Sequence, residues 1–521
     1  MSQISDSSVR SQPDQGATTR RLIHDKIVHW LRAEAHITVD QIDYAAPFYD
    51  LGIDSLGAMA IAAELQEETG KILDPEVMYD LENITELAEY LDSLPVRVRD
   101  SAIHDGADEP CVTMSCDLPD EAPAAANGKL DYFRRRNRLV QSLKDQGLYF
   151  FEPVISEHAG AWVVADGQRM LMLGSYEYLG LLGHPRLKQA AIESIERLGT
   201  GHHGARLVAG TTDIHLALEA RLADLMHSED AIVFSSGYVA NLATIGSVVG
   251  IGDYIIGDQW NHASIVDGCH MSGAAFVEFE HNDMDSLAER LAQHAGRRTL
   301  VVVDAIFSMD GDVIDLPAVV HLCKQHDALL MVDEAHSLGV LGTHGRGIQE
   351  HFGLRPDDID IKMGTLSKTL AGTGGFVAAS REITTYLRHH ARGYIFSGAL
   401  SASFASIALA AIDVLESEPE LLQRLWDNVE YYINGLKALG FDTGLSTTPI
   451  VPIMTKNNDL TLEMTKRCRS RGLLVVPICF PAVPMDAPRL RTCMSASLSR
   501  NDLDFALDVL GDVAREIGLI E

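Results

Sequence analysis

From about residue 131 onward, short apolar runs rich in β-branched residues alternate with longer segments of helical spacing. The apolar runs are AIVFSS, DYIIGD, AAFVEFEH, RTLVVVDAIFS, ALLMVDEAH, IDIKMGTLS and GGFVAAS. The helical segments between them cover about 238–249, 262–272, 284–295 and 316–326. This alternation predicts an α/β fold whose mostly parallel sheet is covered by helices on both faces. After about residue 400 the pattern predicts a long helix and then a smaller α+β lobe.

The preceding part of the chain has a different composition. Helical patterns lie at about 20–35, 56–70 and 84–93, and Lys71 is the only basic residue between Asp40 and Leu94. Residues 20–95 are therefore predicted to form a small, acidic α-helical bundle. Residues 96–130 mix Pro, Gly, Ala, Asp and Glu without an apolar period, which predicts a linker, and residues 1–19 are expected to be disordered.

Overall composition excludes several classes of partner. The net charge of -32 argues against nucleic acid or an anionic membrane as a partner. Seven cysteines without C-x-x-C spacing predict free thiols in a reducing compartment, and no metal site is predicted. The uncharged stretch 231–252 could span a bilayer by length, but its Ser, Gly, Asn and Thr residues favour a strand, a turn and a helix. With no apolar signal segment at the amino terminus, a cytoplasmic protein without a membrane span is expected.

Residues that could react with or bind a ligand follow three of the predicted strands. Ligands of such sheets bind beyond the carboxyl ends of the strands. The residues there are Asp333, His336, Thr365, Ser367, Lys368, Ser236, Gly237 and Tyr238. A lysine can form a Schiff base with an aldehyde, a carboxylate can pair with a pyridinium nitrogen, and a helix amino terminus can bind a phosphate. Each residue alone could be an ordinary surface group, but together they favour pyridoxal phosphate (PLP).

Residues 131–518 resemble the α-oxoamine synthases, which are fold-type I enzymes that use PLP. The stretches that carry the resemblance are GSYEYLGL, GARLVAGTTDIHLALE, FSSGYVAN, NHASIVDG, FSMDGDVIDLP, VDEAHSLGVLGTHGRG, GTLSKTLAGTGG, YIFSGALS and PAVPMDAPRLRTCMSAS. The resemblance implies a PLP-binding major domain over 131–400, including an N-terminal arm, and a minor domain over 401–521. It also implies a homodimer with shared active sites, and a condensation of a small amino acid with an acyl thioester that gives an α-amino ketone and CO2.

The resemblance implies a role for each matching residue. Lys368 would be the Schiff-base lysine and proton shuttle, Asp333 would hold the pyridinium nitrogen, and His336 would bond the phenolic oxygen. The other implied cofactor contacts are His262 on the ring face, Ser308 near the ring, and Ser236, Gly237, Tyr238, Thr365 and a second subunit's Ser397 around the phosphate.

A guanidinium fork suits the carboxylate of the amino acid, and the resemblance assigns this role to Arg491, with Arg489 as the less favoured alternative. Two departures from the family pattern are Glu177, where many relatives have Asn, and Ala205, where they have Ser or Thr. Both departures leave the substrates open, so glycine, alanine and serine all stay possible, with an acyl chain of unknown length.

The stretch YDLGIDSLGAMAIAAEL places Ser55 at the start of a predicted helix, where a serine commonly serves as an N-cap. Residues 20–95, however, resemble an acyl carrier protein with Asp54, Ser55 and Leu56 as its attachment motif. That resemblance implies 4′-phosphopantetheine on Ser55, a phosphopantetheinyl transferase that adds it and an enzyme that loads the acyl group. Gly57 in the first turn would be a poor choice if capping were the only purpose.

The two halves together predict an acyltransferase that condenses an amino acid with an acyl thioester on its own fused carrier. One alternative is a PLP-dependent aminotransferase that acts on a carrier-bound carbonyl, because folds of this type host many reactions. The other is a scaffold without activity that docks a carrier to another synthase, which the presence of Lys368 disfavours.

Overall fold

The structure is a computed structural model that describes residues 23, 26, 65, 69, 83–93, 130, 133, 134, 137–479, 482–484 and 487–521. Its described residues divide into two compact units, one as far as Tyr149 and the other from Phe150 to Glu521. The first unit contains helices α3 (Ile84–Ser93) and α5 (Arg138–Asp145), and α3 confirms the helix predicted at 84–93. Ser55, the expected disordered residues 1–19 and most of the predicted linker lie outside the described residues.

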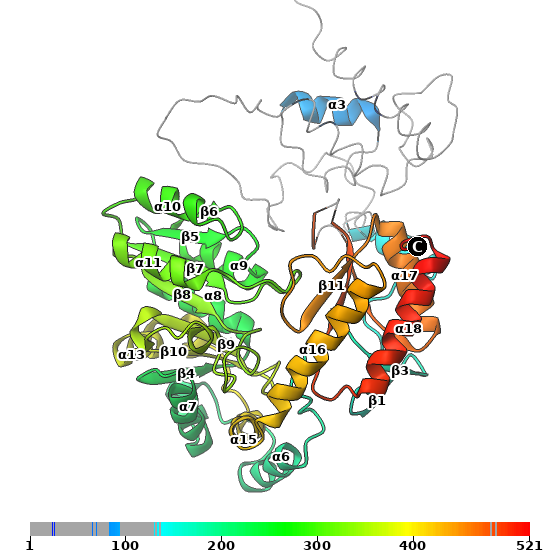
Figure 1. Ribbon diagram of the computed structural model, residues 1–521. Helices are drawn as coiled ribbons and strands as arrows, with labels where there is room; N and C mark the ends of the chain where they lie inside the picture. The colour runs from blue at the N-terminus through cyan, green and yellow to red at the C-terminus, as the bar shows by residue number, and fades with distance from the viewer. Residues whose placement is uncertain are drawn as a thin grey trace, which may run out of the picture. The chain divides into compact units, whose positions relative to one another are not determined.

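The second unit has a major lobe built on a seven-stranded sheet (Figure 1). Its strand order is β4-β10-β9-β8-β7-β5-β6, and all neighbours are parallel except at β10, which is antiparallel to both. The seven predicted strands are thus confirmed. They are β4 (Asp230–Phe234), β5 (Tyr254–Asp258), β6 (Ala275–Phe279), β7 (Thr299–Asp304), β8 (Leu329–Asp333), β9 (Ile361–Thr365) and β10 (Gly375–Ala379).

Helices cover both faces of this sheet, as predicted, because alternate strand residues enter different apolar clusters. Val301 and Val303 of β7 belong to one cluster, whereas Leu300 and Val302 of the same strand belong to the other. The first cluster includes α7 (Asp213–Leu225), α10 (Met284–Gln293) and α11 (Leu316–His326), and the second includes α8 (Gly237–Val248), α9 (Ala263–Ser272) and α13 (Arg381–His390).

The long helix predicted after residue 400 is two helices, α15 (Ala402–Ser417) and α16 (Glu420–Ala438). Pro419 separates them, since it has no backbone N–H to continue the hydrogen bonding of α15. The predicted α+β region follows as an antiparallel sheet of order β11-β14-β13 with two long helices. These elements are β11 (Ile450–Met454), α17 (Asn458–Ser470), β13 (Val476–Ile478), β14 (Arg489–Cys493) and α18 (Arg500–Glu516).

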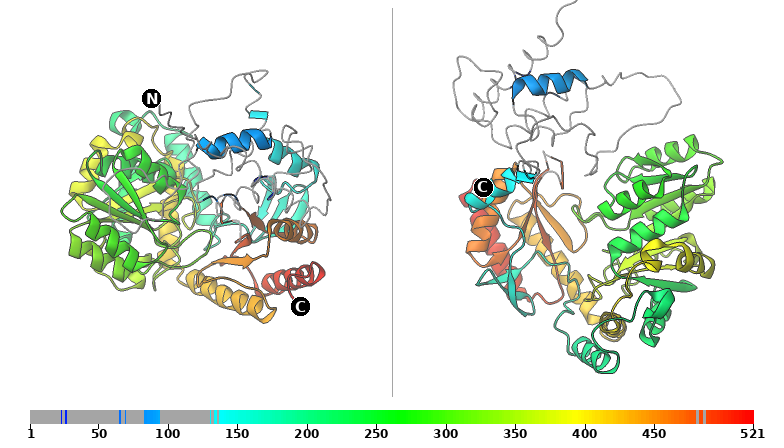
Figure 2. Two further views of the ribbon diagram at one scale, coloured as in Figure 1. Left: turned by 90° about the horizontal axis from the view of Figure 1, so that it is seen from above. Right: turned by 180° about the vertical axis from the view of Figure 1, so that it is seen from behind.

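The minor lobe also includes strands from the amino-terminal end of this unit. Strands β1 (Ile155–Ala159), β2 (Trp162–Ala165) and β3 (Gln168–Met172) form a sheet that β12 (Leu473–Leu474) extends by parallel pairing with β3. Figures 1 and 2 show these early strands beside α17 and α18, away from the major lobe. A division of the chain at residue 400 therefore does not separate the lobes.

The remaining elements are short or connect the lobes. They are α6 (Pro185–Leu198), a π-helical turn η2 (Arg206–Gly210), α12 (Ile348–His351), η3 (Pro356–Asp358) and α14 (Arg392–Ile395). Among the described residues, no helix combines the length and the apolarity that a bilayer crossing needs.

Candidate active site

Four neighbouring parallel strands of the major lobe end in polar residues at one edge of the sheet. These residues are Thr365 on β9, Asp333 on β8, Asp304 on β7 and Asp258 on β5, and Asp304 pairs in register with Asp333. Burial, together with the charge of Asp333, raises the pKa of Asp304 well above its usual range. Asp304 in turn accepts the backbone N–H of His262 at 2.7 Å, which fixes the start of α9.

Lys368 lies three residues beyond the end of β9, in a tight loop where its carbonyl accepts the N–H of Ala371 at 2.9 Å. Burial lowers the pKa of Lys368 to about 8, with Arg491 acting in the same direction and Asp333 opposing it. An amine with this pKa is half neutral near pH 8, which makes it a nucleophile under mild conditions.

A second buried lysine, Lys362 on β9, provides a contrast. Burial also lowers the pKa of Lys362 to about 8. Its Nζ, however, donates to the carbonyls of Met226 at 2.8 Å and Pro356 at 3.3 Å. Lys362 is thus held by the backbone as a structural group, whereas the pKa of Lys368 is influenced by the charges of Asp333 and Arg491.

His336 is buried and is paired with a tyrosine. Its Nδ1 lies 2.6 Å from the hydroxyl of Tyr178, on the segment that follows β3. Burial and the charges of Lys368 and Arg491 hold the pKa of His336 well below its usual range. The imidazole is therefore neutral at physiological pH.

A chain of hydrogen bonds connects His262 to Asp333 through a residue that the sequence prediction missed. His262 Nδ1 lies 2.8 Å from Ser264 Oγ, and Asn241 Nδ2 donates both to Ser264 Oγ and to Asp333 Oδ2 at 2.8 Å. Asn241 is fully buried on the inner side of α8, where Thr244 is the only other polar residue among the buried ones. An asparagine in such an apolar helix was the available signal.

The start of α8 forms the part of the site suited to a phosphate. Ser236 caps the helix by accepting the N–H of Val239 at 3.1 Å, and Gly237 is its first residue. A Cβ at Gly237 would lie 3.1 Å from Thr365 Oγ1, so the end of β9 touches the helix start. The backbone N–H groups at a helix start suit an anion, and the hydroxyl of Thr365, which donates to the carbonyl of Gly374 at 3.1 Å, adjoins them. Tyr238 is 43% exposed and directs its hydroxyl to Asp267.

Two other predicted residues lie on loops. Ser308 is half-buried on the segment between β7 and α11, and Ser397 follows α14, where its hydroxyl lies 3.5 Å from the carbonyl of Gly398. Within the described part of the chain, neither serine hydrogen-bonds to Lys368, Asp333 or His336. Their predicted roles stay predictions.

The two arginines of β14 differ in their partners. Arg489 is 3% exposed, donating from Nη1 to the carbonyl of Met309 at 3.2 Å and to the carboxylate of Asp310. Arg491 has a buried Nε with no hydrogen-bond partner, and its charge lowers the pKa of nearby Lys368 and His336. The geometry thus favours Arg491 over Arg489 as the group that can accept a carboxylate.

The two departures from the family pattern have structural consequences. Glu177 accepts the N–H of Leu182 at 2.9 Å and lies 3.6 Å from His158 Nε2, and burial raises its pKa. Ala205 immediately precedes the π-helical turn η2, whose Arg206 forms a buried ion pair with Glu219 at 2.9 Å.

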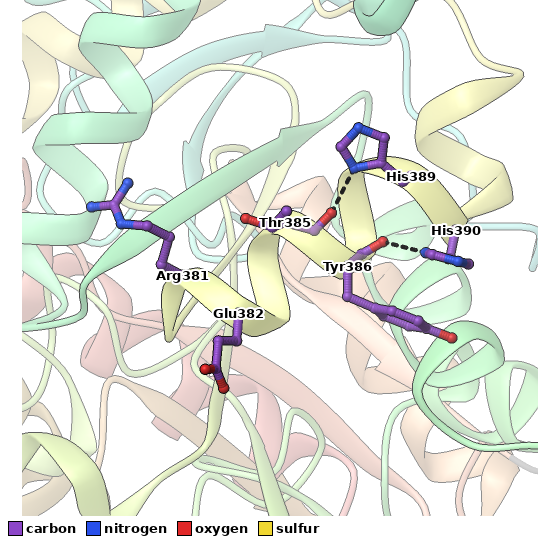
Figure 3. Close-up of a pocket in the computed structure, with 6 residues that line it drawn as sticks. All are labelled: Arg381, Glu382, Thr385, Tyr386, His389 and His390. Atoms are coloured by element: carbon purple, nitrogen blue, oxygen red, sulfur yellow. Dashed lines mark hydrogen bonds between the residues drawn. The ribbon is translucent and has the colours of Figure 1, made fainter.

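A surface groove elsewhere has no relation to these residues. Figure 3 shows it along α13, where the ring of Tyr386 stacks on His390 at 4.1 Å and His389 bonds the carbonyl of Thr385. None of the strand-end residues lines this groove.

Comparison with known proteins assigns a family to two regions of the chain. Residues 168–510 match the family described as aminotransferase class I and II, and residues 25–91 match the phosphopantetheine attachment site family. An 8-amino-7-oxononanoate synthase of Geobacter sulfurreducens is 44% identical over 385 residues, which are 73% of this chain and 98% of that protein. A serine palmitoyltransferase of Sphingobacterium spiritivorum is 40% identical over 393 residues, 75% of this chain and 98% of its own. The chain belongs to the α-oxoamine synthase family.

Solved structures agree with this assignment. A serine palmitoyltransferase from S. paucimobilis, with PLP and myriocin bound, has a TM-score of 0.73 at 34% identity and covers 75% of this chain and all of that one. The 8-amino-7-oxononanoate synthase of Francisella tularensis has a TM-score of 0.58 at 26% identity, over 66% of this chain and 97% of that one. The chain is therefore an enzyme of this family with the fold-type I architecture, and the resemblance inferred from its sequence is confirmed.

Proposed function

We propose that this α-oxoamine synthase condenses a small amino acid with an acyl thioester carried by phosphopantetheine on its own Ser55. The observation that carries the proposal is the position of Lys368, a buried lysine three residues beyond the carboxyl end of β9, whose lowered pKa is influenced by the charges of Asp333 and Arg491. The match of residues 25–91 to the phosphopantetheine attachment family supports the carrier half of the proposal.

The site fits PLP by its own chemistry. Lys368 would hold the aldehyde, Asp333 the ring nitrogen, and the N–H groups of α8 with Thr365 the phosphate. Because residue 237 is glycine, the space between the start of α8 and the end of β9 stays open, whereas a side chain there would narrow it. His262 would lie against the ring, and neutral His336 has its Nε2 left for the phenolic oxygen. Ser236, Tyr238 and Ser308 complete the proposed contacts, with Ser397 of the partner subunit reaching the phosphate.

When bound, PLP supplies an electron sink that stabilises negative charge at the α-carbon of the amino acid. Lys368 removes the α-proton and later returns a proton to the same carbon, because its lowered pKa allows both directions near neutral pH. Arg491 holds the carboxylate through its guanidinium group, whose buried Nε has no hydrogen-bond partner in the structure. In the balanced reaction the α-carbon bonds to the acyl carbon, the thiol leaves, and the carboxylate departs as CO2.

The carrier would deliver the acyl group without free diffusion. A tethered thioester reaches an effective concentration in roughly the millimolar range when its linker can span the two sites. A phosphopantetheinyl transferase and an acyl-loading enzyme are the partners that this scheme requires. The homodimer with shared sites and the cytoplasmic location stay predictions.

The first test is a visible absorption titration of the purified protein with glycine, L-alanine and L-serine. A lysine-bound PLP gives a yellow band, and the band should shift with the amino acid that is the true substrate. Folded protein that shows no band after PLP is added would contradict the proposal.

The second test concerns the carrier. Expression with a phosphopantetheinyl transferase should add one phosphopantetheinyl mass to the wild type and none to Ser55→Ala. With the carrier acylated, amino ketone should form in a single turnover without coenzyme A thioester. If Ser55→Ala formed amino ketone as fast as the wild type in the presence of the transferase and the acyl-loading enzyme, the carrier function would be contradicted. The synthase function would still stand.

A further inference from the structure

With Arg491 proposed to bind the carboxylate, Arg489 has no part of its own in the proposed reaction. The strand β14 that carries both belongs to the minor lobe, whereas the partners of Arg489, Met309 and Asp310, belong to the major lobe. They lie on residues 307–312, here called the inter-lobe loop, which connects β7 to α11. Arg489 is therefore a bridge between lobes.

The inter-lobe loop is a compact turn that the minor lobe holds at several points. The N–H of Gly311 donates to the carbonyl of Phe307 at 2.8 Å, and Thr448 Oγ1 donates to the carbonyl of Gly311 at 2.9 Å. Gly311 has φ +73°, and a Cβ there would lie 2.1 Å from the carbonyl oxygen of Ile450 on β11. The loop thus touches the backbone of the strand that pairs with β14.

The major lobe holds the same loop from the other side through His281. Its Nε2 bonds Asp312 at 2.9 Å and its Nδ1 bonds Asp258, at the end of β5, at 3.0 Å. The ring stacks on Trp260 at 3.8 Å, in the segment that leads to His262. The inter-lobe loop is therefore tied both to the residues that precede His262 and to the strand that carries Arg491.

We propose that Arg489 and Asp310 are positioning residues that set the place of Arg491 relative to Lys368. Residues 489 and 491 are two apart on one strand, so their side chains leave the sheet on the same face. Arg491 has no bond at Nε to hold its own side chain, and therefore its position depends on where β14 is held. Productive geometry requires placement to within about 0.5 Å, which the anchored neighbour Arg489 provides. The proposal rests on the proposed function, in which Arg491 binds the amino acid.

The test uses Asp310→Asn in the full-length, PLP-loaded protein, because Asp310 is partly exposed and asparagine fits its place. Hydrogen exchange should speed up both in 307–313 and in 489–493, while the visible band of Lys368 keeps its position. The dissociation constant of the amino acid, read from that band, should rise about 5- to 10-fold, as expected for a weakened charge-assisted contact. Thr448→Val should give a smaller change in the same direction.

The control is Arg471→Gln, which removes an arginine ion pair with Glu516 on the minor-lobe surface and should change neither readout. The decisive comparison is Asp310→Asn in an Arg491→Lys background, where it should weaken amino-acid binding no further. Additive losses would overturn the proposal. Unchanged exchange in 489–493, or faster exchange with unchanged affinity, would also overturn it.

If no amino acid shifts the band of the wild type, the proposed function fails by itself. The exchange rates of 489–493 in wild type and Asp310→Asn then decide whether Arg489 positions the strand.

Discussion

The major lobe places Lys368, Asp333 and His262 just beyond or at the ends of neighbouring parallel strands, whereas the minor lobe offers Arg491 from the middle of the antiparallel strand β14. Parallel strands bring their carboxyl ends to one edge by construction, so the major-lobe residues meet because of local connectivity. Arg491 is carried by the other lobe, which residues 307–312 contact through Arg489 and Thr448. The residues proposed to hold the cofactor thus come from one sheet, while the arginine proposed to bind the substrate comes from the other lobe.

Two lysines and two arginines of this unit also differ in how firmly they are held. Lys362 and Lys368 both have pKa values of about 8, and Arg489 and Arg491 share one strand. In each pair one member is held by fixed partners, Lys362 by backbone carbonyls and Arg489 by Met309 and Asp310. Of the other two, Arg491 has a buried Nε without a hydrogen-bond partner. Within these two pairs, residue type does not distinguish the group proposed to act, whereas the fixed partners of Lys362 and Arg489 do.

The largest effect is expected for Lys368→Ala. Loss of the amine should abolish the visible band and reduce the condensation rate by more than about 1,000-fold, as for other groups essential to chemistry. Absorbance and product formation measure both effects.

Lys362→Met is the matched control, because it removes the other buried lysine of lowered pKa. It should lower the unfolding temperature and leave the band in place. A band that survived in Lys368→Ala but vanished in Lys362→Met would reverse the assignment of the two lysines.

The next effect concerns the substrate half of the site. Arg491→Lys keeps the charge but loses the guanidinium fork, so KM for the amino acid should rise about 10- to 100-fold, the equivalent of about 1.5–3 kcal/mol. PLP binding, measured by the visible band, should stay unchanged. Arg471→Lys, on the surface of the same lobe, serves as control, and a loss of PLP in Arg491→Lys would show that the two halves are not separate.

A smaller effect is expected for Asn241→Ala, which breaks the hydrogen-bond chain between Asp333 and Ser264. Affinity for PLP should fall about 10-fold, because a buried carboxylate loses a donor. Dialysis against PLP-free buffer followed by absorbance measures the retention. Asn428→Ala, which removes a buried asparagine bonded to the carbonyls of Ser495 and Leu498, should reduce stability without this loss. Equal retention in the two variants would remove Asn241 from the site.

The smallest effect on turnover is expected at His281, since the inter-lobe loop keeps its minor-lobe bonds. Although burial opposes it, Asp258 and Asp312 raise the pKa of His281 to about 9 from 6.5. A raised pKa gives stability that is complete below pH 6.5 and is lost as pH rises through about 9.

The difference in unfolding free energy between wild type and His281→Gln should therefore shrink over pH 6.5 to 9, by at most about 1.4 kcal/mol per pH unit. Denaturant unfolding across this range measures it. A difference that grew with pH would mean that the imidazole is neutral in the folded protein.

Much of the major lobe was predictable from sequence because its signals are local. Alternating strand and helix patterns predicted all seven strands, and the residues at their ends predicted which side chains would gather there. Asn241 was missed because its partners, Ser264 and Asp333, are 23 and 92 residues away. The long helix after residue 400 was predicted without its break at Pro419.

The sequence by itself determined the family, the order of strands along the chain and the identity of the strand-end residues, because each depends on neighbours within a few positions. Only the tertiary structure decided which arginine is engaged, which lysine is held by backbone carbonyls, and which strands complete the minor lobe. Met309 and Asp310 precede Arg489 by about 180 residues, and β3 precedes β12 by about 300. No local pattern encodes pairings at such separations, since they arise only when the apolar faces of both lobes are buried together.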